Sequence, residues 1–145
     1  MRIAKIRDVK TPTRGTSQSA GLDFYVPNDF VTACLKQGDA VFIPSGIKID
    51  VPNDFALIAF NKSGVALKKN LSVGACVVDS DYQGEVHLHV YNFANTPVTI
   101  EPGEKLVQMV LLPVSYVDVT VVKENDLFET ETQRGTGGFG STGIF

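Results

Sequence analysis

Apolar and polar residues alternate along several short segments of the chain. Apolar side chains occupy every second position over 47–51, 86–90 and 98–100, and in 86–90 they alternate with two histidines. A period of two is typical of a strand with one buried face. The segments 55–60 and 106–112 are apolar almost throughout, as is usual for strands covered on both faces. All five segments are therefore predicted to be β-strands.

Glycine and proline residues lie between these segments. The chain has 13 glycines and 7 prolines, and turn signals separate the predicted strands. The signals are Pro44-Ser45-Gly46, Pro52-Asn53-Asp54, Asn95-Thr96-Pro97 and Glu101-Pro102-Gly103. Many short strands at regular spacing predict an all-β sandwich or barrel. One short helix is expected over 63–68, with Ser63 as its N-cap.

The longest stretch without glycine or proline runs from Val114 to Arg134. It opens with β-branched residues, which favour strands over helices. An acidic polar segment follows Val122, and five of the ten residues from Arg134 to Gly143 are glycine. A segment of that composition buries too little surface to order itself. The sequence therefore predicts a single domain with a β core over 1–123 and a mobile, glycine-rich C-terminal arm over 124–145.

Composition narrows the class of partner. The 145 residues include 13 Lys and Arg against 16 Asp and Glu, a formal net charge of −3, which argues against direct binding to a nucleic-acid backbone. A small anionic ligand needs only a few local donors. No apolar run approaches the roughly 18–20 residues that span a bilayer, and no secretory signal is seen. We expect a cytoplasmic protein whose two cysteines, Cys34 and Cys76, are small buried side chains in a reducing compartment.

The glycine-rich arm is the first candidate for chemistry. Free backbone N–H groups in glycine turns form concave anion sites, and Arg134 adds a planar fork of donors suited to phosphate. Ser141 and Thr142 add hydroxyls, and Phe139 is an aromatic ring that can stack on a base. A flexible tail without a ligand has the same composition, and the pattern is not that of a P-loop. Both interpretations stay open on composition alone.

Two further segments place charged side chains next to glycine. The stretch from Asp79 to Glu85 could hold a general base or a metal, or be an ordinary hairpin turn. The segment Asn61-Lys62-Ser63-Gly64 contains a cation and a hydroxyl at the expected start of a helix, where anions commonly bind. The alternative interpretation is a simple helix cap. His87 and His89 share one strand face, but no third zinc ligand lies nearby in the sequence. These histidines are predicted to be polar residues of an outer face.

Taken together and in order, these segments resemble the five motifs of the homotrimeric deoxyuridine triphosphatases (dUTPases). The first three motifs are Ala20-Gly21-Leu22-Asp23-Phe24, Asn61-Lys62-Ser63-Gly64-Val65-Ala66 and the stretch from Gly74 to Glu85. The last two are Gly103-Glu104-Lys105-Leu106-Val107-Gln108 and the stretch from Arg134 to Gly143. The resemblance covers nearly the whole chain. It departs from the family's pattern where Asn61-Lys62 stands for Pro-Arg and where Cys76 replaces glycine or a similar small residue.

The resemblance implies a β jelly-roll homotrimer with three active sites shared between subunits. The reaction would be hydrolysis of dUTP to dUMP and pyrophosphate, with Mg²⁺ on the triphosphate. This activity limits the incorporation of uracil into DNA and supplies dUMP for thymidylate synthesis. Motifs one, two and four would come from one chain, motif three from a second and motif five from the third. Neither a membrane, nor direct nucleic-acid binding, nor a protein regulator is indicated.

The same resemblance implies roles for individual residues. Asp79 would orient and deprotonate the water that attacks the α-phosphorus, and Asp23 would reach the Mg²⁺ through water. Backbone groups between Val73 and Tyr82 would read uracil, with the Tyr82 ring against the deoxyribose. The full set of residues expected to bind substrate is Lys62, Ser63, Gly64, Val73, Gly74, Val78, Tyr82, Gln108, Arg134, Gly138, Phe139, Gly140, Ser141 and Thr142.

Two other functions fit parts of the pattern. The dCTP deaminases share the fold, but that family needs a catalytic glutamate in the strand after motif three, where this chain has His89. The second alternative is a binding module, in which a dUTPase-like trimer sequesters a partner protein. The complete set of motif residues argues against a loss of catalysis and leaves a second role open.

Overall fold

The computed structural model describes residues 1–139 and 141 of the chain. Two compact units are present, Met1–Ser115 and Tyr116–Phe145. Within the described residues, every strand and the α-helix belong to the first unit. The second unit contains a short 3₁₀ helix, η1 (Glu124–Asp126).

Ten short strands build the described part of the first unit. They are β1 (Arg2–Lys5), β2 (Leu22–Tyr25), β3 (Ala33–Leu35), β4 (Ala40–Asp50), β5 (Phe55–Asn61), β6 (Leu71–Val73), β7 (Val77–Val78), β8 (Glu85–Asn92), β9 (Val98–Ile100) and β10 (Lys105–Pro113). They form two four-stranded sheets, in the orders β1-β4-β8-β6 and β2-β10-β5-β7, and a two-stranded sheet of β3 and β9. The helix α1 (Ser63–Lys69) follows β5.

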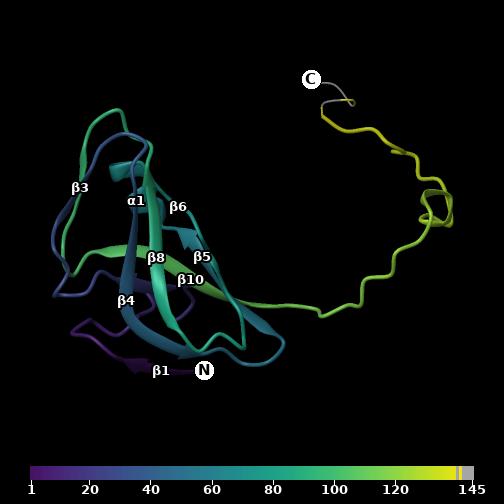
Figure 1. Ribbon diagram of the computed structural model, residues 1–145. Coiled ribbons are helices and arrows are strands. Elements are labelled where there is room, and N and C mark those ends of the chain that lie inside the picture. Colours follow the sequence, from purple (N-terminus) through teal and green to yellow (C-terminus); the bar gives the residue numbers. More distant parts are fainter. Residues whose placement is uncertain (140, 142–145) are drawn as a thin grey trace. The chain divides into compact units, whose positions relative to one another are not determined.

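The two larger sheets share one hydrophobic core. In β8, which lies alongside β4 (Figure 1), Val86, Leu88 and Val90 are at most 1% exposed, whereas the residues between them are only half-buried. Ile43 from β4 and Leu57 from β5 join the same core and are fully buried. Burial of one such side chain stabilises the fold by about 1.5–3 kcal/mol. The alternation of apolar and polar residues therefore determines which face of β8 lies against the core. The predicted all-β fold with one short helix is confirmed.

The segment Pro44-Ser45-Gly46 is not a turn between strands, as the sequence suggested, but lies inside β4. The register of β4 with β8 shifts between Pro44 and Lys48, and the Gly46 N–H donates instead to Oε1 of Glu85 at 2.7 Å. Gly46 has a φ of +74°, and a Cβ there would lie 2.8 Å from the Cβ of Arg7. Glycine is therefore required at this position, where it bends the strand instead of ending it.

The segment from Val77 to Glu85 is not the hairpin that the sequence suggested. β7 pairs with β5, with Leu57 opposite Val78, whereas β6 and β8 pair with each other. The chain therefore crosses from one sheet to the other between β6 and β7. The predicted helix start is also shifted, because Lys62 is the N-cap residue and Ser63 is the first helical residue.

The β-branched run after Val114 forms no strand in the residues that the structure describes. Val117, Val119 and Val121 are 78%, 89% and 93% exposed. A strand needs a neighbouring edge to pair its N–H and C=O groups, so strand propensity is not sufficient here. The predicted functional boundary between a 1–123 core and a 124–145 arm stays a prediction.

Asn92 is a fully buried polar residue at the end of β8. Its Nδ2 donates to the carbonyl oxygens of Leu35 at 2.9 Å and Thr96 at 3.0 Å. Its Oδ1 accepts the N–H of Ala94 at 2.8 Å. These hydrogen bonds offset the cost of burying an amide and tie the end of β3 and the loop between β8 and β9 to the end of β8.

Replacing Asn92 with alanine is expected to lower the free energy of unfolding by about 2–5 kcal/mol. The change leaves the buried carbonyl of Leu35 and the buried N–H of Ala94 without a partner, and each unsatisfied group costs roughly 1–3 kcal/mol. Urea unfolding at a fixed protein concentration measures the loss. Asn53→Ala, in the exposed turn after β4, is the matched control and should change stability by less than about 0.5 kcal/mol. An Asn92→Ala protein as stable as the control would contradict this account.

Candidate active site

Asp23 and two lysines form a cluster of three charged side chains. Asp23 lies on β2, is 5% exposed and stands opposite Gln108 of β10. Lys62, which directly precedes α1, donates to Oδ1 of Asp23. Nζ of Lys105, at the start of β10, lies 3.1 Å from Oδ2 of the same carboxylate. We call Asp23, Lys62 and Lys105 the Asp23 cluster. The motifs predicted site roles for Asp23 and Lys62 but none for Lys105, although Lys105 stands within the fourth motif.

The two lysines keep the buried carboxylate ionised. Burial alone would raise the pKa of Asp23, but the hydrogen bonds and charges of Lys62 and Lys105 outweigh it, so the net pKa lies below the usual range. The hydrogen bond to Asp23 in turn raises the pKa of Lys105. Nζ of Lys10 lies 4.8 Å from the centroid of the Tyr25 ring, which Lys105 also approaches. The Asp23 cluster itself combines two positive charges with one negative charge.

Asn61 joins the second and fourth predicted motifs to the strand that precedes the third. Its backbone carbonyl accepts a hydrogen bond from Nε2 of Gln108 at 2.9 Å. Its side-chain Oδ1 accepts the N–H of Val73 at 2.7 Å, and its Nδ2 donates to Oγ of Ser72 at 3.2 Å. The second motif is thereby tied to the fourth and to the strand that leads into the third. The sequence marked Asn61 only as a departure from the family's proline, and nothing in its neighbours along the chain revealed this role.

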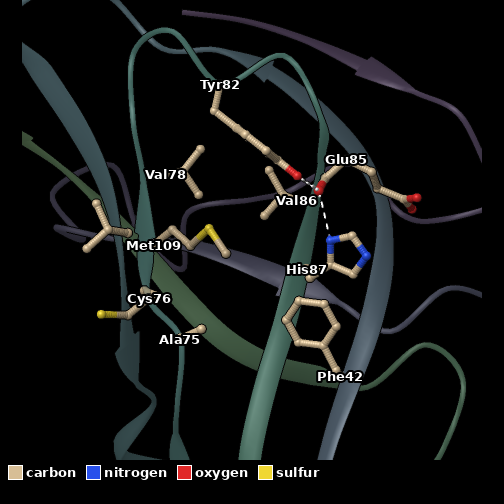
Figure 2. Close-up of a pocket in the computed structure, with 11 residues that line it drawn as sticks. Phe42, Ala75, Cys76, Val78, Tyr82, Glu85, Val86, His87 and Met109 are labelled. Atoms are coloured by element: carbon tan, nitrogen blue, oxygen red, sulfur yellow. Dashed lines mark hydrogen bonds between the residues drawn. The ribbon is translucent and has the colours of Figure 1, made fainter.

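A pocket of about 230 Å³ lies beside the segment predicted to read uracil. The lining residues are Phe42, Ala59, Ala75, Cys76, Val77, Val78, Tyr82, Glu85, Val86, His87 and Met109. Figure 2 shows the side chains of Tyr82 and His87 converging on the carbonyl oxygen of Glu85, each at 2.9 Å. A Cβ on Gly84 would lie 2.2 Å from the Tyr82 hydroxyl oxygen, so only glycine lets the Tyr82 ring fold back against the chain.

The Nδ1 atoms of the two histidines of β8 have opposite roles in their hydrogen bonds. A carbonyl only accepts, so Nδ1 of His87, at 2.9 Å from the Glu85 oxygen, carries a hydrogen. Nδ1 of His89 accepts the N–H of Ala75 at 2.8 Å and is therefore unprotonated. Phe42 stacks on His87 with 4.4 Å between ring centroids, and His89 lies 4.7 Å from Tyr91. The histidines thus position the third motif and join a row of aromatic rings.

The remaining predicted residues of the first unit lie at the ends of these elements. Asp79 follows β7 directly and is exposed, and its carbonyl accepts the N–H of Tyr82 at 3.2 Å. Gly74 donates its N–H to the carbonyl of His89, and Ser63 and Gly64 open α1 on its exposed side. Among the described residues, neither an ion pair nor a hydrogen bond joins the Asp79 carboxylate to the Asp23 cluster.

The second unit forms tight turns around its glycines. Nε of Arg134 donates to the carbonyl of Gly137 at 2.9 Å, and the N–H of Ser141 donates to the carbonyl of Gly138 at 3.0 Å. Phe139 is fully exposed and has a φ of +51°. Two of the predicted residues, Gly140 and Thr142, lie outside the described residues. The roles predicted for this arm stay predictions.

The donors at Asp23 do not fit a metal ion bound directly by the protein. Each carboxylate oxygen contacts a lysine ammonium, and the part of the chain that the structure describes contains no group of three His, Cys, Asp or Glu that could hold a metal. Mg²⁺ is commonly bound through one or two carboxylates together with substrate phosphates and water. The Asp23 carboxylate could therefore approach such an ion through water, but it does not offer a free oxygen for direct coordination.

Comparison with known proteins identifies the family. A family model described as dUTPase matches residues 7–143. The chain belongs to the dUTPase family. A deoxyuridine 5'-triphosphate nucleotidohydrolase of Hydrogenobaculum is 37% identical over 145 residues, which cover 98% of this chain and 96% of that protein. The protein of the same name from Mus musculus is 32% identical and covers 99% of this chain and 85% of its own length.

Solved dUTPase structures share the fold of this chain. The dUTPase of Staphylococcus bacteriophage 80alpha, solved with dUPNHPP, has a TM-score of 0.86 at 21% identity and covers 99% of this chain and 98% of its own. The dUTPase of phage phi11 of S. aureus, described with a structural Mg(II) ion, has a TM-score of 0.74 at 18% identity, covering 87% of this chain and 98% of its own. The predicted jelly-roll fold and the predicted family are confirmed. The described residues include no helix with the length and apolar character needed to cross a membrane.

Asn61→Ala is expected to raise the KM of this dUTPase for dUTP by about 5-fold, with a smaller change in kcat. Alanine keeps the carbonyl that orients Gln108 but loses both side-chain hydrogen bonds to the 72–73 segment, worth roughly 0.5–1.5 kcal/mol each. Steady-state pyrophosphate release gives both constants. Asn95→Ala, in an exposed turn, is the control. Unchanged constants for Asn61→Ala would show that this link does not position the third motif.

Proposed function

We propose that this dUTPase hydrolyses dUTP to dUMP and pyrophosphate, which limits uracil incorporation into DNA and supplies dUMP for thymidylate synthesis. The observation that carries the proposal is the link made by Asn61. It ties the second motif, whose Lys62 belongs to the net positive Asp23 cluster, to the strand that leads into the pocket segment. A nucleotide carries its phosphates and its base at opposite ends of one molecule. The positive Asp23 cluster suits the phosphates, and the pocket suits the base.

Asp79 is the proposed general base. It would take a proton from the water whose oxygen attacks the α-phosphorus, while the bond from that phosphorus to the bridging oxygen breaks and pyrophosphate leaves. A carboxylate is a weak base, so positioning and charge stabilisation must supply most of the rate. One hydrogen of Gln108 Nε2 is donated to the Asn61 carbonyl. The second hydrogen remains for a phosphate oxygen, and Oε1 remains to accept a hydrogen bond from the attacking water.

The phosphate chain is proposed to meet donors from three motifs. These residues are Lys62, Ser63, Gly64, Gln108 and Arg134, with Ser141 and Thr142 closing over the far phosphates. Lysine at 62 keeps the charge of the family's arginine but lacks its bidentate fork. Mg²⁺ carried by the triphosphate would neutralise part of the phosphate charge. Asp23 is proposed to face that ion through water.

Uracil is proposed to be read by backbone groups of Val73, Gly74 and Val78. A site built to pair with uracil leaves buried groups unpaired when cytosine enters. The Tyr82 ring, held by its hydroxyl bond to the Glu85 carbonyl, would lie against the deoxyribose and exclude a 2′-hydroxyl. From the arm, Phe139 would stack on the base, with Gly138 and Gly140 giving its backbone a close approach.

A homotrimer with shared sites is part of the proposal. The pocket of about 230 Å³ is smaller than the roughly 300–1,000 Å³ of a complete ligand pocket, which suggests that one subunit supplies only part of the site. Two members of the aromatic row, Phe42 on β4 and Phe93 directly after β8, are 58% and 68% exposed. Exposed apolar surface of this kind favours an interface. We place the trimer in the cytoplasm, without direct contact to nucleic acid or membrane.

Product release from dUTP and the four common dNTPs, measured together with the mass in solution, tests the proposal. We expect pyrophosphate from dUTP far faster than from the other nucleotides, and a mass near three times 15.7 kDa. Ammonia released from dCTP would indicate a deaminase, and the absence of either product would indicate a binding module. A fully active monomer would contradict the shared site.

A further inference from the structure

The Asp23 cluster contains one more lysine than the proposed mechanism uses. Asp23 is 5% exposed and contacts Lys62 through Oδ1 and Lys105 through Oδ2. The side chain of Lys62 is 22% exposed, whereas that of Lys105 is 46% exposed. Both ammonium groups therefore depend on one buried carboxylate, and neither is sealed away from a ligand.

The strand register places Lys105 at this carboxylate. Lys105 stands opposite Tyr25 and Gln108 opposite Asp23, with the register of β10 on β2 shifting between Lys105 and Val107. Tyr25 is 4% exposed, and its hydroxyl is 2.6 Å from that of Thr13. Nζ of Lys105 lies 5.8 Å from the centroid of this fixed ring. The position of Lys105 is thus defined by a buried neighbour as well as by the ion pair.

The other charges of the Asp23 cluster determine how much of the positive charge of Lys62 is available to a ligand. A buried carboxylate beside Lys62 alone would cancel its positive charge, because opposite charges at short range with little water between them interact strongly. With Lys105 on the second oxygen, two positive charges share one negative charge and the cluster keeps a net charge of +1. A triphosphate gains from that surplus charge more than a monophosphate does.

We propose that Lys105 is a positioning residue of the phosphate site, which shares Asp23 with Lys62 and thereby keeps the positive charge of Lys62 available to the triphosphate. The inference rests on the proposed function, because it assumes that Lys62 contacts phosphate. It accounts for a lysine that is half exposed yet pairs with a buried carboxylate.

Calorimetric binding of dUpNHpp and of dUMP, both in EDTA, tests this role. The ratio of the two dissociation constants isolates the affinity that comes from the additional phosphates. Lys105→Met should lower this triphosphate preference about 10-fold, and Lys105→Arg, which keeps the charge, should stay within about 3-fold of the wild type. Lys36→Met removes the same charge from the exposed turn before β4 and should leave the preference within about 2-fold. A loss in Lys105→Arg as large as in Lys105→Met would overturn the charge-based role.

The decisive variant combines Asp23→Asn with Lys105→Met. It removes one charge of each sign, so the net charge of the cluster returns to +1 and Lys62 has no carboxylate to cancel it. We expect the double variant to recover the triphosphate preference to within about 3-fold of the wild type. A purely structural role for Lys105 predicts no such recovery. A double variant as weak as Lys105→Met would mean that Lys105 acts either structurally or by its own contact with phosphate, and either result would overturn the proposal.

The outcomes separate this inference from the proposed function. A wild-type protein that binds dUpNHpp no more tightly than dUMP would disprove the proposed phosphate site. A wild-type protein with a clear preference that Lys105→Met leaves unchanged would disprove only the role of Lys105. If Lys105→Met does not fold, the double variant, which leaves no unpaired buried carboxylate, is compared directly with the wild type. A low preference there overturns the proposal.

Discussion

The Asp79→Asn variant is expected to hydrolyse dUTP about 10²–10⁴-fold more slowly than the wild type, the usual range for loss of a general base. Asparagine keeps the size and a hydrogen bond of the side chain but does not accept a proton at neutral pH. Asp79 is exposed and has no ion pair with the Asp23 cluster among the described residues. The affinity for dUpNHpp should therefore change by less than about 3-fold. Steady-state pyrophosphate release and calorimetry measure the two effects.

Asp81→Asn is the matched control for this experiment. Asp81 is an exposed carboxylate two residues further along the same turn, but Asp79 alone directly follows β7, which pairing with β5 holds in place. We expect Asp81→Asn to turn over dUTP within about 3-fold of the wild type. A near-normal rate for Asp79→Asn, or an equal loss in both variants, would remove Asp79 from its proposed role.

A chain that ends after Gln133 is expected to lose about 10²-fold or more of the turnover while keeping its fold and the subunit number of the full chain. The truncation removes Arg134 and the glycine backbone that follows it, and loss of one positioned donor to a developing charge costs about 10²–10³ in kcat. All strands of the described residues end by Pro113, so the core should persist. Pyrophosphate release gives the rate, and sedimentation gives the mass. Removing only Ile144 and Phe145, beyond the fifth motif, is the control.

A fluorescent reporter follows the same arm in the intact chain. The protein has no tryptophan, so Phe139→Trp introduces a single indole where a base is proposed to stack. Its emission should shift or be quenched on binding Mg²⁺ with dUpNHpp, and should respond less to dUMP, which lacks the phosphates that would hold the arm. Full activity of the chain that ends after Gln133, or an indole signal that ignores the analogue, would show that the arm is a tail without a role in the site.

Much of the fold could be predicted from local patterns. The alternation over 86–90 predicted a strand with one buried face, and Val86, Leu88 and Val90 are buried in β8 as expected. Side-chain direction in a strand depends only on parity along the chain, so a single sequence carries this information. The family was predictable for a different reason, because five short motifs stand in the family's order over nearly the whole chain.

Which strands pair, and which charges meet, was decided only by the tertiary structure. The sequence suggested a hairpin around Asp79, yet β7 pairs with β5. It suggested a turn at 44–46, yet the chain continues through β4 because Gly46 adopts a positive φ and donates to Glu85. Strand partners are distant in sequence, and local propensity does not distinguish a bend within a strand from its end.

The site shows the same division. The motifs identified Asp23, Lys62 and Gln108 as residue types that suit phosphate chemistry. Lys105 becomes a partner of Asp23 only through the pairing of β10 with β2, and Asn61 reaches Val73 only because α1 turns the chain back between them. Residues 82 positions apart, such as Asp23 and Lys105, share no local pattern. Their contact depends on register, which the packing of both sheets onto one core determines.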